Sequence, residues 1–531
     1  MDTDVLIIGA GPVGLTLAID LGRRGVRCML VEQKSQPHMW PKMERCNARS
    51  MEIYRRLGLS QKIRAAGLPA WVPMDVFLVL SMTQPPLLHL PYPSVNAARK
   101  KIDATNDGTL PLEPYQLISQ YTLEPLLKSV AETLPSVTVR YGCEYLSFSQ
   151  DADSVIAEVS ETGKTSAITA KYLVGCDGGT SAVRKQLGFK LEGEGNILQL
   201  RQALFRCEDL FERISIGKGR HYHVADSQST QLIVQDSTKH FTVHSVVETD
   251  ADMATKFEQT VGMPVKYEML YVGEWRQNLL LAERYMDRRV LLAGDAVHLV
   301  IPTGGLGMNT GVGDAIDLGW KLAGTLQGWG GPGLLASYEA ERRPVGAKNV
   351  GASRYASLGR RKWRSQWKPN IADDTPEGAA TRANLVAVAD VEQRKTNEMV
   401  GAELGYHYAG SPLIASEPGE PPYDYIDYTP STFPGVRLPH AWLPDGRAVQ
   451  DCIGDGFTLL RFGSSSADGS ALASAFRQIG APFTTLDLPS QAARDIYGCD
   501  LILVRPDLHV AWRGSALPAE PDKLAATVTG H

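Results

Sequence analysis

The stretch Asp4–Glu32, DVLIIGAGPVGLTLAIDLGRRGVRCMLVE, decides the fold. A short apolar run leads into Gly9, Gly11 and Gly14, a helix-compatible segment follows, and a second apolar run ends at Glu32. This order predicts strand, turn, helix and strand. Gly9 permits the tight turn, Gly11 leaves the backbone bare toward a pyrophosphate, and Gly14 lets the helix and the strand pack closely.

The acidic residue that ends this stretch makes the glycine motif a more specific signal of dinucleotide binding. Glu32 stands 18 residues after Gly14, where a carboxylate can accept hydrogen bonds from ribose hydroxyls and would repel a 2′-phosphate. An ordinary glycine turn in an α/β protein is the alternative. With strands on both sides and an acid at this spacing, the sequence favours a dinucleotide site.

Composition limits the remaining possibilities. A chain of 531 residues is too long for one ordinary core, so we expect two or three domains. The net charge of -5 favours neither nucleic acid nor an anionic membrane as a partner. The chain has no apolar run of the roughly 20 residues that span a bilayer. Its seven cysteines are scattered without a C-x-x-C pair, which argues against disulfides and a metal site. We therefore expect a cytoplasmic protein.

Two further glycine clusters follow strand-like runs. GCDGGTSAVRKQLG, residues 175–188, places Asp177 and bare backbone where open α/β sheets bind ligands; an unrelated strand-turn-helix is the alternative. RRVLLAGDAVHLVIPTGGLGMNTG, residues 288–311, ends in a helix that begins near Met308. Its free N–H groups suit a polarised carbonyl, such as the pyrimidine edge of a flavin.

The rest of the chain divides by pattern. Residues 195–282 alternate in polarity, which predicts an antiparallel sheet that forms the wall of a substrate pocket. Residues 330–400 are helical and charged, and 410–438 form a linker. The tail from about residue 438 has strand runs around a helical segment and predicts a small α/β module.

The three motifs, GAGPVG with Glu32, GCDGGTSAVR, and LAGDAVH with PTGGLGMNTG, resemble those of the flavoprotein aromatic hydroxylases, which are single-component FAD-dependent monooxygenases. GYHYAGSPLI and PGVRLPHAWLPDGR are similar to the branch that includes phenol hydroxylase, hydroxyphenylpropionate hydroxylase and polyketide hydroxylases. The resemblance implies an α/β protein with a Rossmann-like FAD-binding domain (1–75, 112–190 and 283–370), an inserted β-sheet substrate domain (76–111 and 191–282), a helical segment and linker (371–437) and a thioredoxin-like α/β domain (438–531).

The resemblance also implies site residues. It places Pro302 beside the reactive flavin edge and Arg45, or its neighbour Glu44, in a loop that reaches the flavin. Val297 and Asp317 depart from the alanine and asparagine common in the family. The residues expected to bind FAD are Gly9, Gly11, Pro12, Gly14, Glu32, Arg45, Gln120, Asp177, Asp295, Gly305, Gly307, Met308 and Asn309.

The implied activity is hydroxylation of a phenol through a C4a-hydroperoxyflavin, with NADPH or NADH as electron donor and O2 as oxidant. Such a reaction needs a dry pocket and a base that draws the phenol toward phenolate. The candidate bases are His221, His223, Tyr222 and Tyr271, beside the catalytic candidates Pro302 and Arg45, whereas we expect a structural role for His298. Because few cations stand among the aromatic residues of 195–285, the insertion hints at a neutral phenol more than a benzoate-like acid.

Other activities stay open at this point. A Baeyer-Villiger or quinone-forming oxygenase on a polyketide-like substrate would use the same coenzyme, and a non-catalytic flavin-binding protein would keep the same motifs. A flavin-dependent halogenase would show W-x-W-x-I-P, and no two tryptophans of this chain are separated by one residue. The expected partners are a small aromatic substrate and O2, and a homodimer is compatible with the resemblance.

Overall fold

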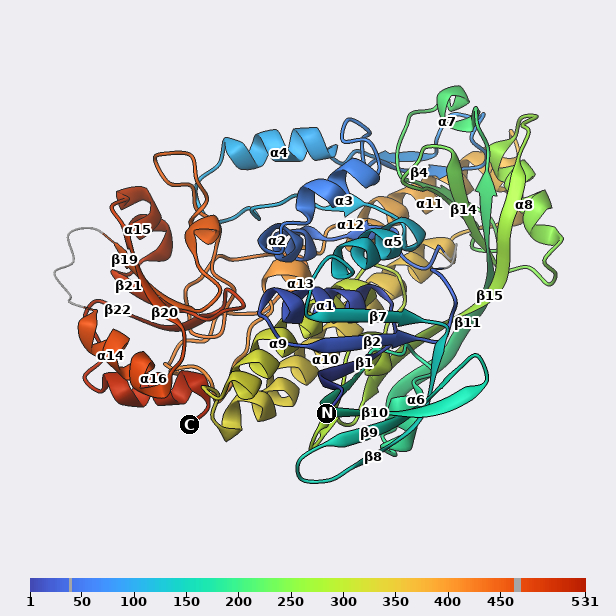
Figure 1. Ribbon diagram of the computed structural model, residues 1–531. Coiled ribbons are helices and arrows are strands. Elements are labelled where there is room, and N and C mark those ends of the chain that lie inside the picture. The colour runs from blue at the N-terminus through green and yellow to red at the C-terminus, as the bar shows by residue number, and fades with distance from the viewer. Residues whose placement is uncertain (38–40, 463–468) are drawn as a thin grey trace.

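The computed structural model describes residues 1–37, 41–462 and 469–531. Figure 1 shows a central sheet with helices packed around it, a second large sheet to the right, and a smaller sheet with its own helices to the left, where the chain ends. The structure has the mixed α/β class expected from the sequence.

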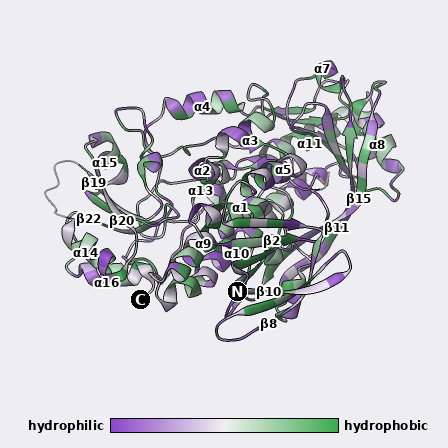
Figure 2. Ribbon diagram, in the orientation of Figure 1, coloured by the Kyte–Doolittle hydropathy of each residue, from purple (hydrophilic) through white to green (hydrophobic). Residues whose placement is uncertain are grey.

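The central sheet carries the first glycine motif. Its strands β17, β10, β1, β2 and β7 run parallel in that order, and β16 is antiparallel to β17. Strands buried on both faces need apolar residues throughout, which matches the mostly hydrophobic colouring of this sheet in Figure 2. Two antiparallel strands, β8 and β9, extend from β10. The bounds are β1 Thr3–Ile8, β2 Cys28–Glu32, β7 Val137–Tyr141, β8 Cys143–Gln150, β9 Val155–Glu161, β10 Lys164–Gly175, β16 Met286–Asp287 and β17 Val290–Leu292.

The second sheet includes the predicted insertion and more. Its order is β18, β15, β11, β14, β13, β12, β4 and β5, antiparallel except for the parallel pair β12 and β4. The edge strand β18 belongs to the third glycine motif, so the glycine loop and the insertion share one sheet. The bounds are β4 Val76–Val79, β5 Leu88–Leu90, β11 Leu191–Arg206, β12 His221–Val224, β13 Gln231–Val234, β14 His240–Ser245, β15 Glu268–Ala282 and β18 His298–Leu299.

Helices connect and cover these sheets. The longest, α10 (Pro332–Arg364), runs beside α9 (Gly307–Gln327) and continues to the second sheet, where Trp363 packs with Leu78 of β4. A short ladder pairs β3 (Arg45–Cys46) with β6 (Gln116–Leu117). The other helices before the C-terminal module are α1 Pro12–Arg23, α2 Ala48–Arg56, α3 Ser60–Ala66, α4 Val95–Asp103, α5 Gln120–Ala131, α6 Ala182–Gln186, α7 Leu210–Arg213, α8 Asp252–Val261, α11 Pro376–Glu392, α12 Arg394–Asn397 and α13 Val400–Leu404.

The C-terminal module is a four-stranded mixed sheet with helices on both faces. Successive residues of β19 point to opposite faces of this sheet. Leu459 packs with α14 and α16, whereas Leu460 packs with α15. Trp320 of α9 belongs to the same hydrophobic cluster as Leu459, so the module is seated on α9. The bounds are β19 Phe457–Phe462, α14 Ser470–Ile479, β20 Phe483–Leu488, α15 Gln491–Tyr497, β21 Leu501–Val504, β22 Val510–Gly514 and α16 Pro521–Thr529.

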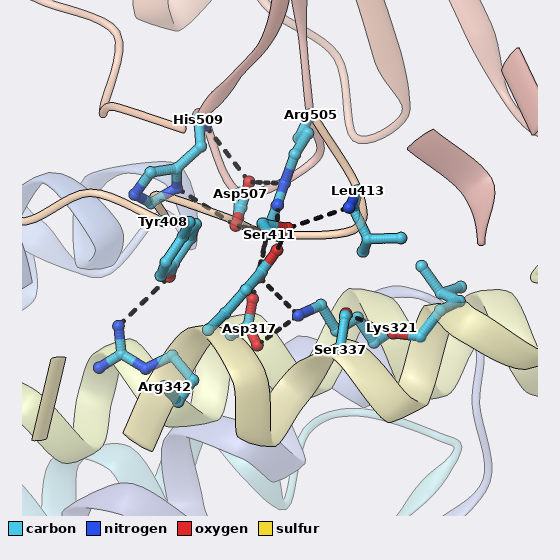
Figure 3. Close-up of polar contacts among 12 residues, drawn as sticks. Asp317, Lys321, Ser337, Arg342, Tyr408, Ser411, Leu413, Arg505, Asp507 and His509 are labelled. Carbon is cyan, nitrogen blue, oxygen red and sulfur yellow. Dashed lines mark hydrogen bonds and ion pairs between the residues drawn. The ribbon is translucent and has the colours of Figure 1, made fainter. Parts of the chain in front are cut away.

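A buried ion network fastens this module (Figure 3). Arg505 of the module donates to Glu341 of α10 (Nη1 to Oε1, 2.6 Å). Lys321 of α9 donates to Glu341 (2.6 Å) and to Asp317 (2.7 Å). Burial raises the pKa of Asp317 to about 8, although the nearby cations act in the opposite direction. Lys321, one turn later on the same helix, thus provides the buried Asp317 with an ion-pair partner.

Among the residues that the structure describes, no helix combines the length and the apolar character needed to cross a lipid bilayer. The seven cysteines all lie in the described part of the chain, and each is a free thiol.

We predict that Glu341→Gln lowers the free energy of unfolding by about 3–5 kcal/mol, because Arg505 and Lys321 would keep their charge in a buried site with less compensation. Denaturant unfolding measures the loss. The matched control is Asp445→Asn, which breaks an exposed pair with Arg447 and should leave the stability nearly unchanged. Equal losses in the two variants would contradict the assignment.

Candidate functional site

A cavity of about 1000 Å³ lies between the central sheet and the second sheet. The three glycine motifs line one part of it, and side chains from β12, β13, β15 and α10 line the other. Its volume is at the upper end of the usual range for small-molecule pockets. One cavity therefore offers room for a dinucleotide and a second ligand.

The first glycine turn has the geometry that an approaching pyrophosphate requires. Gly9 has a φ of +103°, and a Cβ there would lie 2.5 Å from the carbonyl oxygen of Cys176. A Cβ on Gly14 would lie 2.1 Å from the carbonyl oxygen of Gly9. A Cβ on Gly11, in contrast, would meet only Glu124 Oε1, at 3.9 Å. Gly9 and Gly14 are thus needed by the fold itself, whereas Gly11 keeps a side chain out of the cavity.

The carboxylate of Glu32 completes this turn. It accepts hydrogen bonds from the backbone N–H groups of Ala10 and Lys34, both at 3.0 Å, and it lines the cavity. The helix α1 begins beside it at Pro12, without a side chain that caps the first N–H groups. Free N–H groups and a carboxylate at these places suit the phosphates and a ribose of an ADP group.

The third glycine motif is fixed from behind by Asp314 of α9. Its Oδ2 accepts from the backbone N–H of Gly294 (3.0 Å) and contacts His298 Nε2 (2.9 Å), while its Oδ1 accepts from Arg342 Nε (2.8 Å). Burial alone would raise the pKa of Asp314, but Arg342 and His298 lower it below its usual value. His298 therefore holds the loop and leaves base chemistry to other residues.

Arg45 and Asn309 shape the loop that precedes α9. Arg45 Nη2 donates to the carbonyl oxygen of Gly304 (2.7 Å) and to Glu403 Oε1 (2.9 Å). Asn309 Nδ2 donates to the carbonyl oxygen of Arg45 (3.1 Å), and its Oδ1 accepts from the N–H of Asn47 (2.9 Å). These bonds hold the loop open toward the cavity at the start of α9.

Most residues expected to contact the coenzyme meet at this cavity. Gly14 lies behind the turn and does not line it. Gln120 lines it but donates to Glu124 Oε1 (2.6 Å), and Asp177 accepts from Ser181 Oγ (2.5 Å) and the N–H of Val183 (3.1 Å). The expected coenzyme-binding residues that line the cavity are Gly9, Gly11, Pro12, Glu32, Arg45, Gln120, Asp177, Asp295, Gly305, Gly307, Met308 and Asn309.

The catalytic candidates differ in whether they line the cavity. Pro302, Arg45 and His221 line the cavity, whereas Tyr222, His223 and Tyr271 do not. Successive residues of a strand point to opposite faces, so Tyr222 turns into the core, where its hydroxyl donates to the carbonyl oxygen of Gly217 (2.8 Å). The expected roles of Tyr222 and Tyr271 as bases therefore lose their geometric basis.

His223 should share the face of His221, yet it is covered. Its side chain is fully buried, contacts Gln393 (Nε2 to Nε2, 3.2 Å) and lies against the ring of Trp363. The end of α10 and the segment near α12 close over this position. Strand alternation alone could not show this cover, because both segments lie more than 100 residues away in the sequence.

His221 forms a buried pair with Glu44. Its Nε2 lies 2.8 and 2.9 Å from the two carboxylate oxygens, and its Nδ1 is buried without a hydrogen-bond partner in the described part of the chain. Burial, reinforced by the charge of Arg220, lowers the pKa of His221 to about 4 despite the opposing effect of Glu44. The imidazole is therefore neutral at pH 7 and donates from Nε2, which leaves Nδ1 able to accept a proton.

Several lining residues were not found from the sequence. They share a polar or charged side chain on a segment without a glycine motif: Arg220, Gln231, His244, Arg360 and Arg364, together with Glu403, which binds Arg45. The one available signal was the spacing of Arg360 and Arg364, which places both on one face of a helix.

Comparisons with known proteins agree with this geometry. Residues 2–353 match the model of the FAD binding domain, and residues 431–530 match that of the aromatic-ring hydroxylase C-terminal domain. The FAD-dependent monooxygenase apdD of Emericella nidulans is 33% identical, over 99% of this chain and 90% of that protein. The 2,4-dichlorophenol 6-monooxygenase of Cupriavidus pinatubonensis is 30% identical, over 98% of this chain and 94% of that protein.

A solved structure extends the likeness to three dimensions. RebC, soaked with chromopyrrolic acid and with bound 7-carboxy-K252c, superposes with a TM-score of 0.91 at 34% identity, over 99% of both chains.

The glycine turn yields a prediction about coenzyme retention. We expect Gly11→Ala to leave the stability of the FAD-free protein unchanged and to weaken FAD binding, because its Cβ meets open space that the pyrophosphate needs. Gly14→Ala should lower both the stability of the FAD-free protein and its affinity for FAD, since its Cβ would lie against the carbonyl of Gly9. Flavin absorbance per chain, FAD titration and thermal unfolding of the stripped protein measure the two effects.

Gly454→Ala serves as the control, because a Cβ there meets no other atom within 4 Å. Full FAD retention by Gly11→Ala would contradict the assigned approach of the pyrophosphate.

Proposed function

This chain belongs to the family of FAD-dependent monooxygenases that includes the aromatic-ring hydroxylases, and on that premise we propose that it hydroxylates a phenolic ring with O2 and NAD(P)H. The observation that carries the proposal is the His221–Glu44 pair in the same cavity that the glycine motifs line. A pocket built only to store a coenzyme would need no such pair.

FAD, when bound, supplies the redox and oxygen chemistry. The glycine turn, Glu32 and the N-terminus of α1 would hold its ADP half, and the loop before α9 would hold its ring system. The residues fit this group, because the position of Gly11 leaves the backbone bare and Glu32 stands where a ribose would lie. The electron donor and the phenolic class of the substrate are parts of the proposal.

His221 is proposed as the base. Its Nε2–H is held by Glu44, so Nδ1 is the nitrogen that can accept the phenolic proton. The anionic Glu44, within 3 Å of the ring nitrogen that keeps its proton, offsets part of the burial that disfavours the imidazolium. Drawing the phenol toward phenolate makes the ring more electron-rich where oxygen is added.

A cytoplasmic setting is also proposed. Free thiols persist in reducing compartments, and the seven cysteines of this chain are unpaired.

The function is tested by assaying the FAD-loaded enzyme on a panel of phenols. We expect substrate-stimulated oxidation of NADH or NADPH and a product heavier by one oxygen, since phenol, O2, NAD(P)H and a proton give hydroxylated phenol, NAD(P)⁺ and water. Product mass, H2O2 release and consumption of each nucleotide are measured together. Oxygen inserted beside a ketone would indicate a Baeyer-Villiger reaction instead, and H2O2 without product on every phenol would contradict the proposal.

The base is tested by His221→Asn. We expect product formation to fall by about 100-fold or more, with flavin content unchanged. The loss should shrink as the pH rises toward about 10, where a phenol ionises without help. Rates of product formation across pH measure this.

Tyr271→Phe is the matched control, because Tyr271 lies on the same sheet but does not line the cavity. A wild-type pH profile for His221→Asn would exclude His221 as the base.

A further inference from the structure

Two guanidinium groups on the wall of the cavity, one buried and one partly buried, have only neutral hydrogen-bond partners. Arg220, which is 5% exposed, donates from Nη2 to Asn397 Oδ1 (2.7 Å). Arg360 of α10 donates from Nη1 to Gln231 Oε1 (3.1 Å). Within the described residues, neither group has a carboxylate at ion-pair distance, and the Nε of each has no hydrogen-bond partner.

The surroundings supply less negative charge than these cations require. Glu44 contributes one nearby negative charge, because its partner His221 is neutral, but it lies at ion-pair distance from neither Arg220 nor Arg360. Arg364, one turn after Arg360, adds another cation; it donates to two backbone carbonyls, and its nearest carboxylate, Asp226, lies 3.9 Å away. The wall therefore holds more positive charge than the protein neutralises.

This imbalance is costly. Burial lowers the pKa of Arg360 to about 10 and that of Arg364 to about 9, yet both remain charged at pH 7. An uncompensated buried charge is among the strongest destabilising features in proteins. Burial, helped by the charge of Arg360, lowers the pKa of His244 to about 4, and the Nε2 of this lining residue has no partner in the described chain. A structural role for these arginines would have provided carboxylates.

We propose that the substrate of this enzyme carries a carboxylate, which Arg360 and Arg220 bind while the phenolic ring lies toward His221. The inference rests on the proposed hydroxylation and names the class of substrate as a phenolic acid. A guanidinium offers paired N–H groups that match a carboxylate, and such a charged contact is far stronger away from water. Neutral Gln231 and His244 can add hydrogen bonds without adding charge.

This inference reverses the expectation of a neutral phenol. That expectation counted cations only in the inserted segment 195–285. Arg360 and Arg364 come instead from the far end of α10, and only the fold brings them to β13 and to the loop before it.

The experiment uses FAD-loaded enzyme and matched pairs of probes: 4-hydroxybenzoate, 4-hydroxyphenylpropionate and 6-hydroxy-2-naphthoate, each beside its methyl ester. Binding is measured by the change in flavin absorbance, and turnover by product mass. We expect the wild type to bind the best acid about 10- to 100-fold more tightly than its ester, as one charged hydrogen-bonded contact allows. Arg360→Met should remove that preference and leave ester binding unchanged within about 2-fold.

The control is Lys362→Met, two residues later on the helix, which is exposed, does not line the cavity and should keep the preference. Flavin content and thermal unfolding are compared for all variants, and Arg360→Lys, which keeps the charge, should retain part of the preference. Equal binding of acids and esters by the wild type, failure of every acid to bind, or an Arg360→Met defect confined to NADPH would each overturn the proposal.

The two proposals fail differently. Preference for acids without an oxygenated product would leave the carboxylate site standing and refute hydroxylation. Oxygenated products from neutral phenols with no preference for acids would refute the carboxylate site alone.

Discussion

The buried contact between Asp314 and Arg342 is the interaction on which the site depends. One carboxylate receives the N–H of Gly294, His298 and Arg342, and so joins the glycine loop to α9 and α10. Arg342 also donates from Nη2 to the carbonyl oxygen of Thr310 (2.9 Å), in the first turns of α9. A buried ion pair is tolerated only when its remaining polar atoms are satisfied. Here the satisfying groups are the backbone atoms that shape the loop, so the same bonds that stabilise the pair fix the site.

The C-terminal module extends this constraint. Arg342 Nη1 donates to the hydroxyl of Tyr408 (3.2 Å), and the Tyr408 ring lies against His509 of the module, with ring centres 4.4 Å apart. His509 in turn contacts Asp507, which holds Arg505 (Figure 3). A domain without a cysteine pair thus has a physical purpose: it covers α9 and α10 and completes a polar network that would be costly if open to partial solvation.

Local backbone requirements were predictable from the sequence, whereas the directions of side chains were not. Gly9 and Gly14 follow from the turn itself, because no other residue type fits there. On β12 the sequence offered two neighbouring candidates, and only the fold shows that His221 lines the cavity and that Tyr222 packs in the core. Asp177 was expected to face the coenzyme, yet its carboxylate also caps α6. The arginines of α10 were the largest omission, since a charged helix in sequence is usually a solvated surface.

The helix α10 resolves how one pocket can be both dry and cationic. Arg342 in its first half fixes the glycine loop, and Arg360, 18 residues later, stands at the wall of the cavity, about 27 Å along a rigid helix. Oxygen transfer requires that water be excluded, but unpaired guanidinium groups attract water. A substrate anion satisfies both demands, because it neutralises the arginines and displaces their hydration in a single event. The uncompensated charge then has a function: only a ligand that completes the ion pair leaves the cavity dry enough for productive chemistry.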